Sequence, residues 1–152
     1  MNLFEKLAII KHFKFKAIAG KKSSTNWNGA GEGNVSTSIK DNKLFFKEDG
    51  FFKLDENPRA IKIFNEYIWT QLSNNRLRLS HSRFGYDSEI ILFELKPIAI
   101  EHWVSSEAHV CGNDLYSAEL KIINSTIKLS WIIKGPKKDE FIAYTYTSPS
   151  TK

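Results

Sequence analysis

The sequence predicts an all-β protein, a single antiparallel β-barrel of about nine strands with a short N-terminal helix. Three observations lead to this prediction. Apolar and polar residues alternate with a period of two through most of the chain, short polar turns separate the alternating runs, and a tight hairpin occupies residues 115–134. A two-sheet sandwich is the alternative architecture. A barrel of this size would enclose room for one small molecule.

Length and composition agree with one globular domain. The chain has 152 residues, of which 41% are hydrophobic and 13% are aromatic. This length allows one hydrophobic core, and residues 1–152 are therefore treated as a single barrel domain. No repeat, low-complexity tract or second domain is visible in the sequence.

The charge pattern argues against a nucleic-acid partner. The formal net charge is +5 at pH 7, but the basic residues alternate with apolar residues and do not form a long run. Such a pattern is typical of a solvated outer face. The single cysteine excludes an internal disulfide, and neither a membrane-spanning apolar run nor a signal peptide is present. We therefore expect a cytoplasmic protein, and the sequence sets no oligomeric state.

The first elements follow from local patterns. Asn2 and Glu5 have the spacing of a capping box that opens a short helix, which could cover one end of a barrel. From Phe13 the period changes to two, which indicates a strand. His12 falls on the basic outer phase of this strand, so no functional role is expected for it.

A polar loop is expected at residues 20–26, followed by a strand at residues 27–39 that places Trp27 and three glycines on one phase. The glycines are Gly29, Gly31 and Gly33. A phosphate-binding loop would need a preceding strand, a following helix and usually a lysine, and these are absent here. Glycines in a strand instead allow sharp bending or the close approach of another backbone, as the corners of a small barrel require.

A turn at residues 41–42 precedes the most informative strand, residues 43–54. A hairpin at Asp49 and Gly50 is the alternative, but we favour one continuous strand. Phe46, Glu48 and Gly50 then share a phase. Glu48 would be a carboxylate among apolar neighbours, which requires a hydrogen-bonding partner or a raised pKa.

Several turns and prolines are expected to interrupt the strands in the middle of the chain. Asn57 and Pro58 are expected to interrupt it, and residues 61–69 suit a strand better than a helix because aromatic and β-branched residues are enriched. After a turn at residues 74–75, His81 shares the apolar phase of the next strand, where a core histidine is more common than a catalytic one. A loop at residues 83–88 leads to a strand at residues 89–96 that should end at Pro97. Residues 98–104 could be a strand or a connection, and residues 141–147 form the last strand.

The C-terminal hairpin sets a register that can be tested. Two β-rich runs, residues 115–123 and 126–134, are separated by two residues, a spacing typical of a tight turn. Antiparallel counting places Leu120 opposite Leu129, Ala118 opposite Trp131 and Tyr116 opposite Ile133 on one apolar face. Lys121 and Lys128 then face water. Continued to the open end, the register brings Asp114 opposite Gly135.

Two motifs flank this hairpin, and with them the chain resembles a known family. His-Val-Cys-Gly-Asn-Asp-Leu-Tyr occupies residues 109–116, and Gly-Pro-Lys-Lys-Asp occupies residues 135–139. Together with Trp131 they look like the signature of the microbial domain of unknown function 6314. Weaker similarity covers Gly31 and Gly33, residues 46–50 and residues 67–69. The resemblance implies a calycin-like or lipocalin-like barrel and brings no established activity.

Two functions compete for the predicted cavity. The first is binding of a small, partly apolar ligand, with Trp27 and further aromatic side chains as lining and polar groups near the rim. The alternative is a small enzyme that uses His109, Asp114 and Tyr116 near the barrel rim, with Lys137 or Lys138 stabilising an anion. Asp114 could also serve only as a turn cap. The candidate ligand-binding residues are His109, Cys111, Asp114, Tyr116, Trp131, Lys137, Lys138, Glu48, Tyr67, Trp69 and His81.

No cofactor and no metal are expected. His109 and Cys111 stand two residues apart with no further cysteine and no nearby histidine, which leaves too few ligands for a structural zinc site. A lone cysteine is more often a packing residue than a nucleophile.

Overall fold

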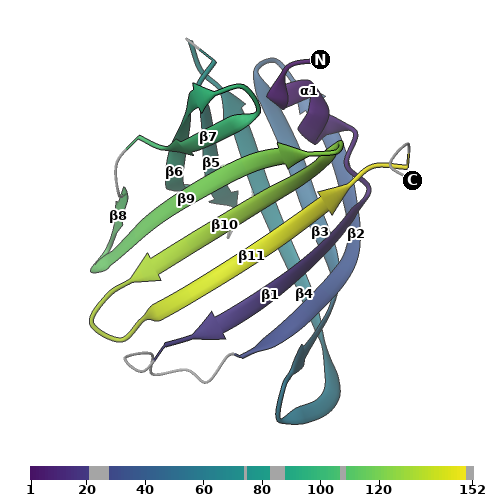
Figure 1. Cartoon of the computed structure of the whole chain (residues 1–152), viewed down its shortest axis with the longest axis vertical. Helices are drawn as coiled ribbons and strands as arrows, with labels where there is room; N and C mark the ends of the chain where they lie inside the picture. The colour runs from purple at the N-terminus through teal and green to yellow at the C-terminus, as the bar shows by residue number, and fades with distance from the viewer. Residues whose placement is uncertain (21–27, 74, 83–87, 107–108, 150–152) are drawn as a thin grey trace.

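The computed structural model describes residues 1–20, 28–73, 75–82, 88–106 and 109–149. These residues form one short helix and an antiparallel sheet of eleven strands (Figure 1). The elements are α1 (Leu3–Ala8), β1 (His12–Ala19), β2 (Gly29–Lys40), β3 (Lys43–Leu54), β4 (Asn57–Gln71), β5 (Leu77–Ser82), β6 (Glu89–Ala99), β7 (His102–Ser105), β8 (His109–Cys111), β9 (Asp114–Ile123), β10 (Thr126–Lys134) and β11 (Asp139–Thr147).

The sheet closes on itself into a barrel. Its order is β10-β11-β1-β2-β3-β4-β5-β6-β7-β9, and β9 also pairs with β10, so these ten strands form a ring. The short β8 pairs with β9 beyond the end of β7. The predicted all-β antiparallel barrel is confirmed, with ten wall strands in place of about nine, and closure excludes the sandwich alternative.

The predicted hairpin register is confirmed residue by residue. Leu120 pairs with Leu129, Ala118 with Trp131 and Tyr116 with Ile133. Both turn residues have positive φ, 50° for Asn124 and 66° for Ser125, as a tight hairpin that follows the twist of its strands requires. The faces are also as predicted. Leu120, Leu129 and Trp131 are buried and Lys121 and Lys128 are exposed, whereas Tyr116, near the barrel rim, is only half-buried.

The helix α1 lies across one end of the barrel (Figure 1). Its predicted capping box is present: the Asn2 side chain accepts a hydrogen bond from the Glu5 backbone N–H, and the Glu5 side chain accepts one from the Asn2 N–H. Leu3, Phe4 and Leu7 are buried and belong to the barrel core. These apolar side chains of α1 therefore cover this end of the barrel.

The glycines of β2 share the inward phase with Val35, and they allow the close approach of another backbone that the sequence predicts. Gly33 pairs with Gly50 of β3. A Cβ atom at either glycine would collide with the backbone of the other strand. The two strands therefore approach at a distance that only glycine permits, and the wall can bend there.

Two predicted chain breaks are wrong. The turn lies at residues 55–56, and β4 begins at Asn57 and runs through Pro58. The pairing of β3 with β4 is irregular between Phe52 and Leu54. Leu54 pairs with Asn57, and the next residue of β4 that pairs with β3 is Ile61. The hydrogen bonds between these two strands therefore do not need the N–H that Pro58 lacks. Likewise β6 continues past Pro97, beyond the last residue that pairs with β5 and beside an irregularity in the pairing with β7.

Some of the remaining predictions can be compared with the structure, and others concern residues that it does not describe. Residues 43–54 form one continuous strand, and residues 98–104 contain the turn into β7. His12 is exposed on β1. Trp27, and most of the predicted loops 20–26 and 83–88, lie outside the described residues. Within the described part of the chain, no helix has the length and apolar character needed to cross a membrane.

Candidate functional site

A cavity of about 620 Å³ lies within one end of the barrel. The parts of β1 and β4 that line it are at the end of the barrel away from α1 (Figure 1). Inward-facing residues of β1, β3, β4 and β11 line it, and its mouth is marked by exposed Ile18 and Phe64 with charged Lys62, Lys138 and Glu140. We call it the open-end cavity. Its volume lies within the range of about 300–1,000 Å³ that is typical of small-molecule pockets.

The walls of the open-end cavity are aromatic and aliphatic. The rings of Phe15 and Phe52 are stacked, with centroids 5.6 Å apart and planes 4° apart. The ring of Tyr144 lies 5.2 Å from that of Phe15. Ala17 and Ile142 add small and branched aliphatic surface. These rings hold one another in place, so the cavity has rigid apolar walls suited to a flat or aliphatic molecule.

The polar groups of the cavity gather at its inner end. Asn65, Tyr67 and Tyr144 line the cavity there, and behind them lies Glu48 of β3, whose exposed fraction is 0%. The alternation of β3 forces this position, because Phe46, Glu48 and Gly50 share the inward phase. The open-end cavity therefore ends on a layer of hydroxyl and amide groups with a carboxyl group beneath it.

Three side chains donate hydrogen bonds to the Glu48 carboxylate. The Tyr144 hydroxyl donates to Oε1 at 3.0 Å, the Tyr146 hydroxyl donates to Oε2 at 2.7 Å, and Nδ2 of Asn65 lies at the long distance of 3.5 Å from Oε1. None of the described ion pairs includes Glu48. We call Glu48, Asn65, Tyr67, Tyr144 and Tyr146 the Glu48 cluster.

Burial changes the acidity of this cluster. Loss of hydration raises the pKa of Glu48 from 4.5 to about 7, although the hydrogen bonds from Tyr146, Tyr144 and Asn65 oppose the rise. Burial, together with the nearby negative charge of Glu48, also raises the pKa of each of Tyr67, Tyr144 and Tyr146 above the ordinary value for a phenol. The tyrosines therefore remain hydroxyl donors, while Glu48 changes charge near neutral pH. The predicted need of Glu48 for partners or a raised pKa is confirmed on both counts.

Tyr67 joins the cluster to the rest of the interior. Its ring makes edge contacts with His81, at 5.4 Å, and with Trp131, at 5.7 Å. Trp131 in turn stacks on Tyr144 with centroids 6.1 Å apart. The candidates Glu48, Tyr67, His81 and Trp131 are thus brought together in three dimensions, with Trp131 packed under the floor of the cavity.

The motif at residues 135–139 builds the rim of the same end. Nζ of Lys138 lies 3.5 Å from Oδ2 of Asp114, and the backbone N–H of Gly135 donates to the carbonyl of Lys138 at 2.8 Å. A Cβ atom at Gly135 would collide with the Asp114 carboxylate, so the predicted juxtaposition of these two residues is present. Lys138 lines the mouth of the cavity, and Asp114 holds it there. Lys137 is exposed.

Other candidates lie farther away or outside the described side chains. Trp69 is buried beside Phe93 in the core and does not line the open-end cavity. The backbone of His109 and Cys111 forms β8 and pairs with Tyr116 and Asp114, but their side chains lie outside what the structure describes.

Sequence reasoning missed the most important members of the site. The strand patterns place Asn65, Tyr144, Tyr146, Phe15 and Phe52 in strands but do not single them out as site residues. The signal for the tyrosines was their spacing of two, which puts both on the inner phase of β11. Their meeting with Glu48 depends on closure of the barrel, since β3 and β11 are separated by β1 and β2 in the sheet.

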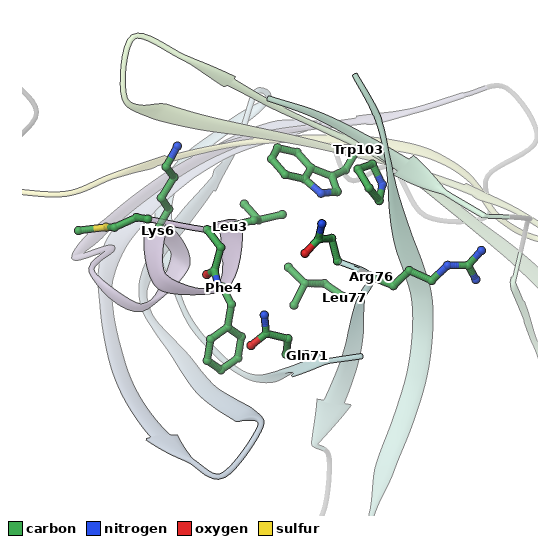
Figure 2. Close-up of a pocket in the computed structure, with 11 residues that line it drawn as sticks. Leu3, Phe4, Lys6, Gln71, Arg76, Leu77 and Trp103 are labelled. Carbon is green, nitrogen blue, oxygen red and sulfur yellow. The ribbon is translucent and has the colours of Figure 1, made fainter. Parts of the chain in front are cut away.

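A second hollow of about 240 Å³ lies at the helix end. Figure 2 shows Leu3 and Phe4 of α1 facing Leu77, Gln71 and Trp103 across it. It follows the seam where α1 covers the barrel, and it is less than half the size of the open-end cavity. Packing of the helix explains it, so the open-end cavity is the better candidate site.

Metal chemistry finds no support among the described side chains, where no three His, Cys, Asp or Glu residues are grouped to hold an ion. The model of a family of unknown function (DUF6314) matches residues 14–148. Neither a curated protein nor a solved structure matches the chain.

Proposed function

The chain belongs to the DUF6314 family, whose description assigns no activity, and from the geometry of its barrel we propose that it binds a small, mostly apolar molecule in the open-end cavity. The observation that carries the proposal is the cavity of about 620 Å³ with apolar walls and a polar floor formed by Asn65, Tyr67 and Tyr144. Most ligand pockets have this composition, with a few polar groups that fix orientation. The proposal includes a calycin-like barrel in the cytoplasm.

The energetics favour an apolar ligand. Burial of apolar surface contributes about 25 cal/mol per Å², and the stacked rings of Phe15 and Phe52 offer preformed walls that need little ordering when a ligand enters. The polar floor would then decide which end of the molecule enters first. The rim with Lys62, Lys138 and Glu140 would stay in contact with water.

The proposal can be tested with a plugged barrel. Ala17 lines the open-end cavity on β1, between Gly29 and Ile142 on the neighbouring strands. Ala17→Phe should fill the entrance to the cavity. Ala30→Phe is the matched control, because Ala30 is exposed on β2, opposite Lys16.

The assay is a fluorescence titration with N-phenyl-1-naphthylamine, a neutral probe that brightens in apolar surroundings. Wild-type protein and Ala30→Phe should enhance its emission to the same degree, and Ala17→Phe should not. Thermal melts would establish that each variant is folded. A folded Ala17→Phe protein that binds the probe as tightly as the wild type would exclude the open-end cavity as the binding site.

A further inference from the structure

We infer that the open-end cavity selects ligands whose buried end donates a hydrogen bond, because the Tyr144 hydroxyl donates its own hydrogen bond to the Glu48 carboxylate and the floor is left rich in acceptors. The ligand class is a mostly apolar molecule with an alcohol, phenol or N–H group at its leading end. The inference rests on the proposed function and adds its specificity. Glu48 is a positioning residue in it, since it acts through the side chains that line the cavity.

Each polar group of the floor has a fixed number of protons that it can donate. A tyrosine hydroxyl has one proton to donate and lone pairs with which to accept. The Tyr144 hydroxyl donates its one hydrogen bond to Oε1 of Glu48, at 3.0 Å, and Tyr144 also lines the cavity. Tyr144 is also hydrogen-bonded to Tyr67. Since the Tyr144 proton points to Glu48, the Tyr67 hydroxyl donates to the Tyr144 oxygen, and both hydroxyls keep only lone pairs for a ligand. A ligand group that could only accept would find no free proton on either.

The side-chain amide of Asn65 also points its donor group toward Glu48. Its Nδ2 faces Oε1 of Glu48, so its Oδ1 points away from the carboxylate, and Asn65 lines the cavity as well. Two floor groups from different strands, β4 and β11, thus direct donors toward Glu48. Hydrogen bonds to an ionised group are stronger than neutral ones, which helps to hold both side chains in this orientation.

Glu48 can also release this orientation. When it is protonated, the carboxyl group has a proton of its own to donate, and the Tyr144 hydroxyl is free to turn its proton toward the cavity. Because burial raises the pKa of Glu48 to about 7, this exchange falls near neutral pH. The preference for donor ligands should therefore be strongest above pH 7 and weaken below it.

Few other groups near Glu48 can titrate. In the described interior, Tyr67 of β4 and Tyr144 and Tyr146 of β11 face it. The inward residues of β1, β2 and β10 around it do not titrate, and they include Phe13, Phe15, Val35, Leu129 and Trp131. His81 of β5 contacts Tyr67, and Tyr116 of β9 lies within electrostatic range of Tyr67. Lys62, Lys138 and Glu140 stand at the mouth, and Asp114 is paired with Lys138.

Two probes of nearly equal shape separate donor from acceptor. 2-Naphthol donates and accepts, whereas 2-methoxynaphthalene only accepts. The ether is the more apolar of the two, so a cavity without a free acceptor should prefer it. At pH 8 we expect the wild-type protein to bind 2-naphthol about five- to tenfold more tightly, the size of one well-placed hydrogen bond. At pH 5.5 the ratio should fall toward one.

Variants identify the groups responsible. Tyr144→Phe should abolish the preference for 2-naphthol at both pH values, and Glu48→Gln should abolish its pH dependence. Tyr146→Phe should move the midpoint to higher pH, because the ionised carboxylate loses a donor at 2.7 Å. Thr145→Val is the matched control. Thr145 lies between the two tyrosines on the other face of β11 and should leave both the preference and its midpoint unchanged.

The outcomes separate the two proposals. Equal affinity of wild-type protein for both probes at pH 8, with binding of both lost in Ala17→Phe, would overturn the inference and leave the proposed function standing. A preference that persisted in Tyr144→Phe would also overturn it. Binding of neither probe, or equal binding to Ala17→Phe, would overturn the proposed function and the inference together.

Discussion

The buried carboxyl group of Glu48 should make the protein less stable as pH rises from about 4.5 to about 7. Its pKa is about 7 in the folded protein and 4.5 as the ordinary value. Below 4.5 the group is protonated in both folded and unfolded chains. Above 7 it is ionised in both, and the folded state then bears the cost of a buried charge. Since one pKa unit corresponds to about 1.4 kcal/mol, the free energy of unfolding should decline by about 3 kcal/mol between these limits.

The change that isolates this effect is Glu48→Gln, which keeps the shape of the side chain and removes the titration. Urea unfolding of both proteins should be followed from pH 4.5 to pH 8. The wild type should lose about 3 kcal/mol relative to the variant over this interval, a large share of the 5–15 kcal/mol typical of a domain.

Asp49→Asn supplies the control for this experiment. Asp49 is the next residue on β3 but faces water, so its variant should follow the pH dependence of the wild type. Parallel curves for wild type and Glu48→Gln would refute the account of Glu48 as a buried acid with a raised pKa.

Three further predictions concern the barrel wall and rim. Trp131→Ala should lower the free energy of unfolding by about 3–5 kcal/mol, because it removes a buried ring, whereas Lys128→Ala should change the urea midpoint hardly at all. Gly33→Ala should destabilise by about 1–3 kcal/mol in the same assay, since its methyl group would collide with the backbone of β3. Asp114→Asn should cost up to about 1 kcal/mol through loss of the half-exposed pair with Lys138 and leave N-phenyl-1-naphthylamine binding intact; loss of probe binding with the fold retained would instead assign Asp114 to the site.

Local rules predict much of this fold because its strands are strongly patterned. The hairpin of β9 and β10 has one apolar and one basic face, so a slip of one residue would bury Lys121 and Lys128, and only one register is compatible with a core. The capping box of α1 is equally local. Each of these features is decided within a few residues of the chain.

The wrong chain breaks have a common origin. Proline excludes a ladder hydrogen bond, and the sequence rule assumes that every strand residue needs one. Pro58 and Pro97 lie where the pairing is irregular or where the neighbouring strand has already ended. The place where a ladder ends is a tertiary property, so the rule could not locate it.

The candidate site could be predicted only in part for a related reason. The alternation of β3 identifies Glu48 as an inward carboxyl group, and that of β4 places Tyr67 inward as well. Which donors reach Glu48 depends on the closure that brings β11 across the barrel from β3. A pattern with a period of two shows which face a residue occupies, but it contains no information about the residue on the opposite wall.

The most direct test of the account is a native mass spectrum of the protein purified from its own host, recorded for the wild type and for Ala17→Phe. The wild-type chain should carry a small-molecule adduct that is released on denaturation and is mostly apolar, with a hydroxyl or N–H group. The Ala17→Phe chain, plugged at the entrance that Phe15 and Ile142 share, should carry none. The same adduct at equal abundance on both chains would contradict binding in the open-end cavity.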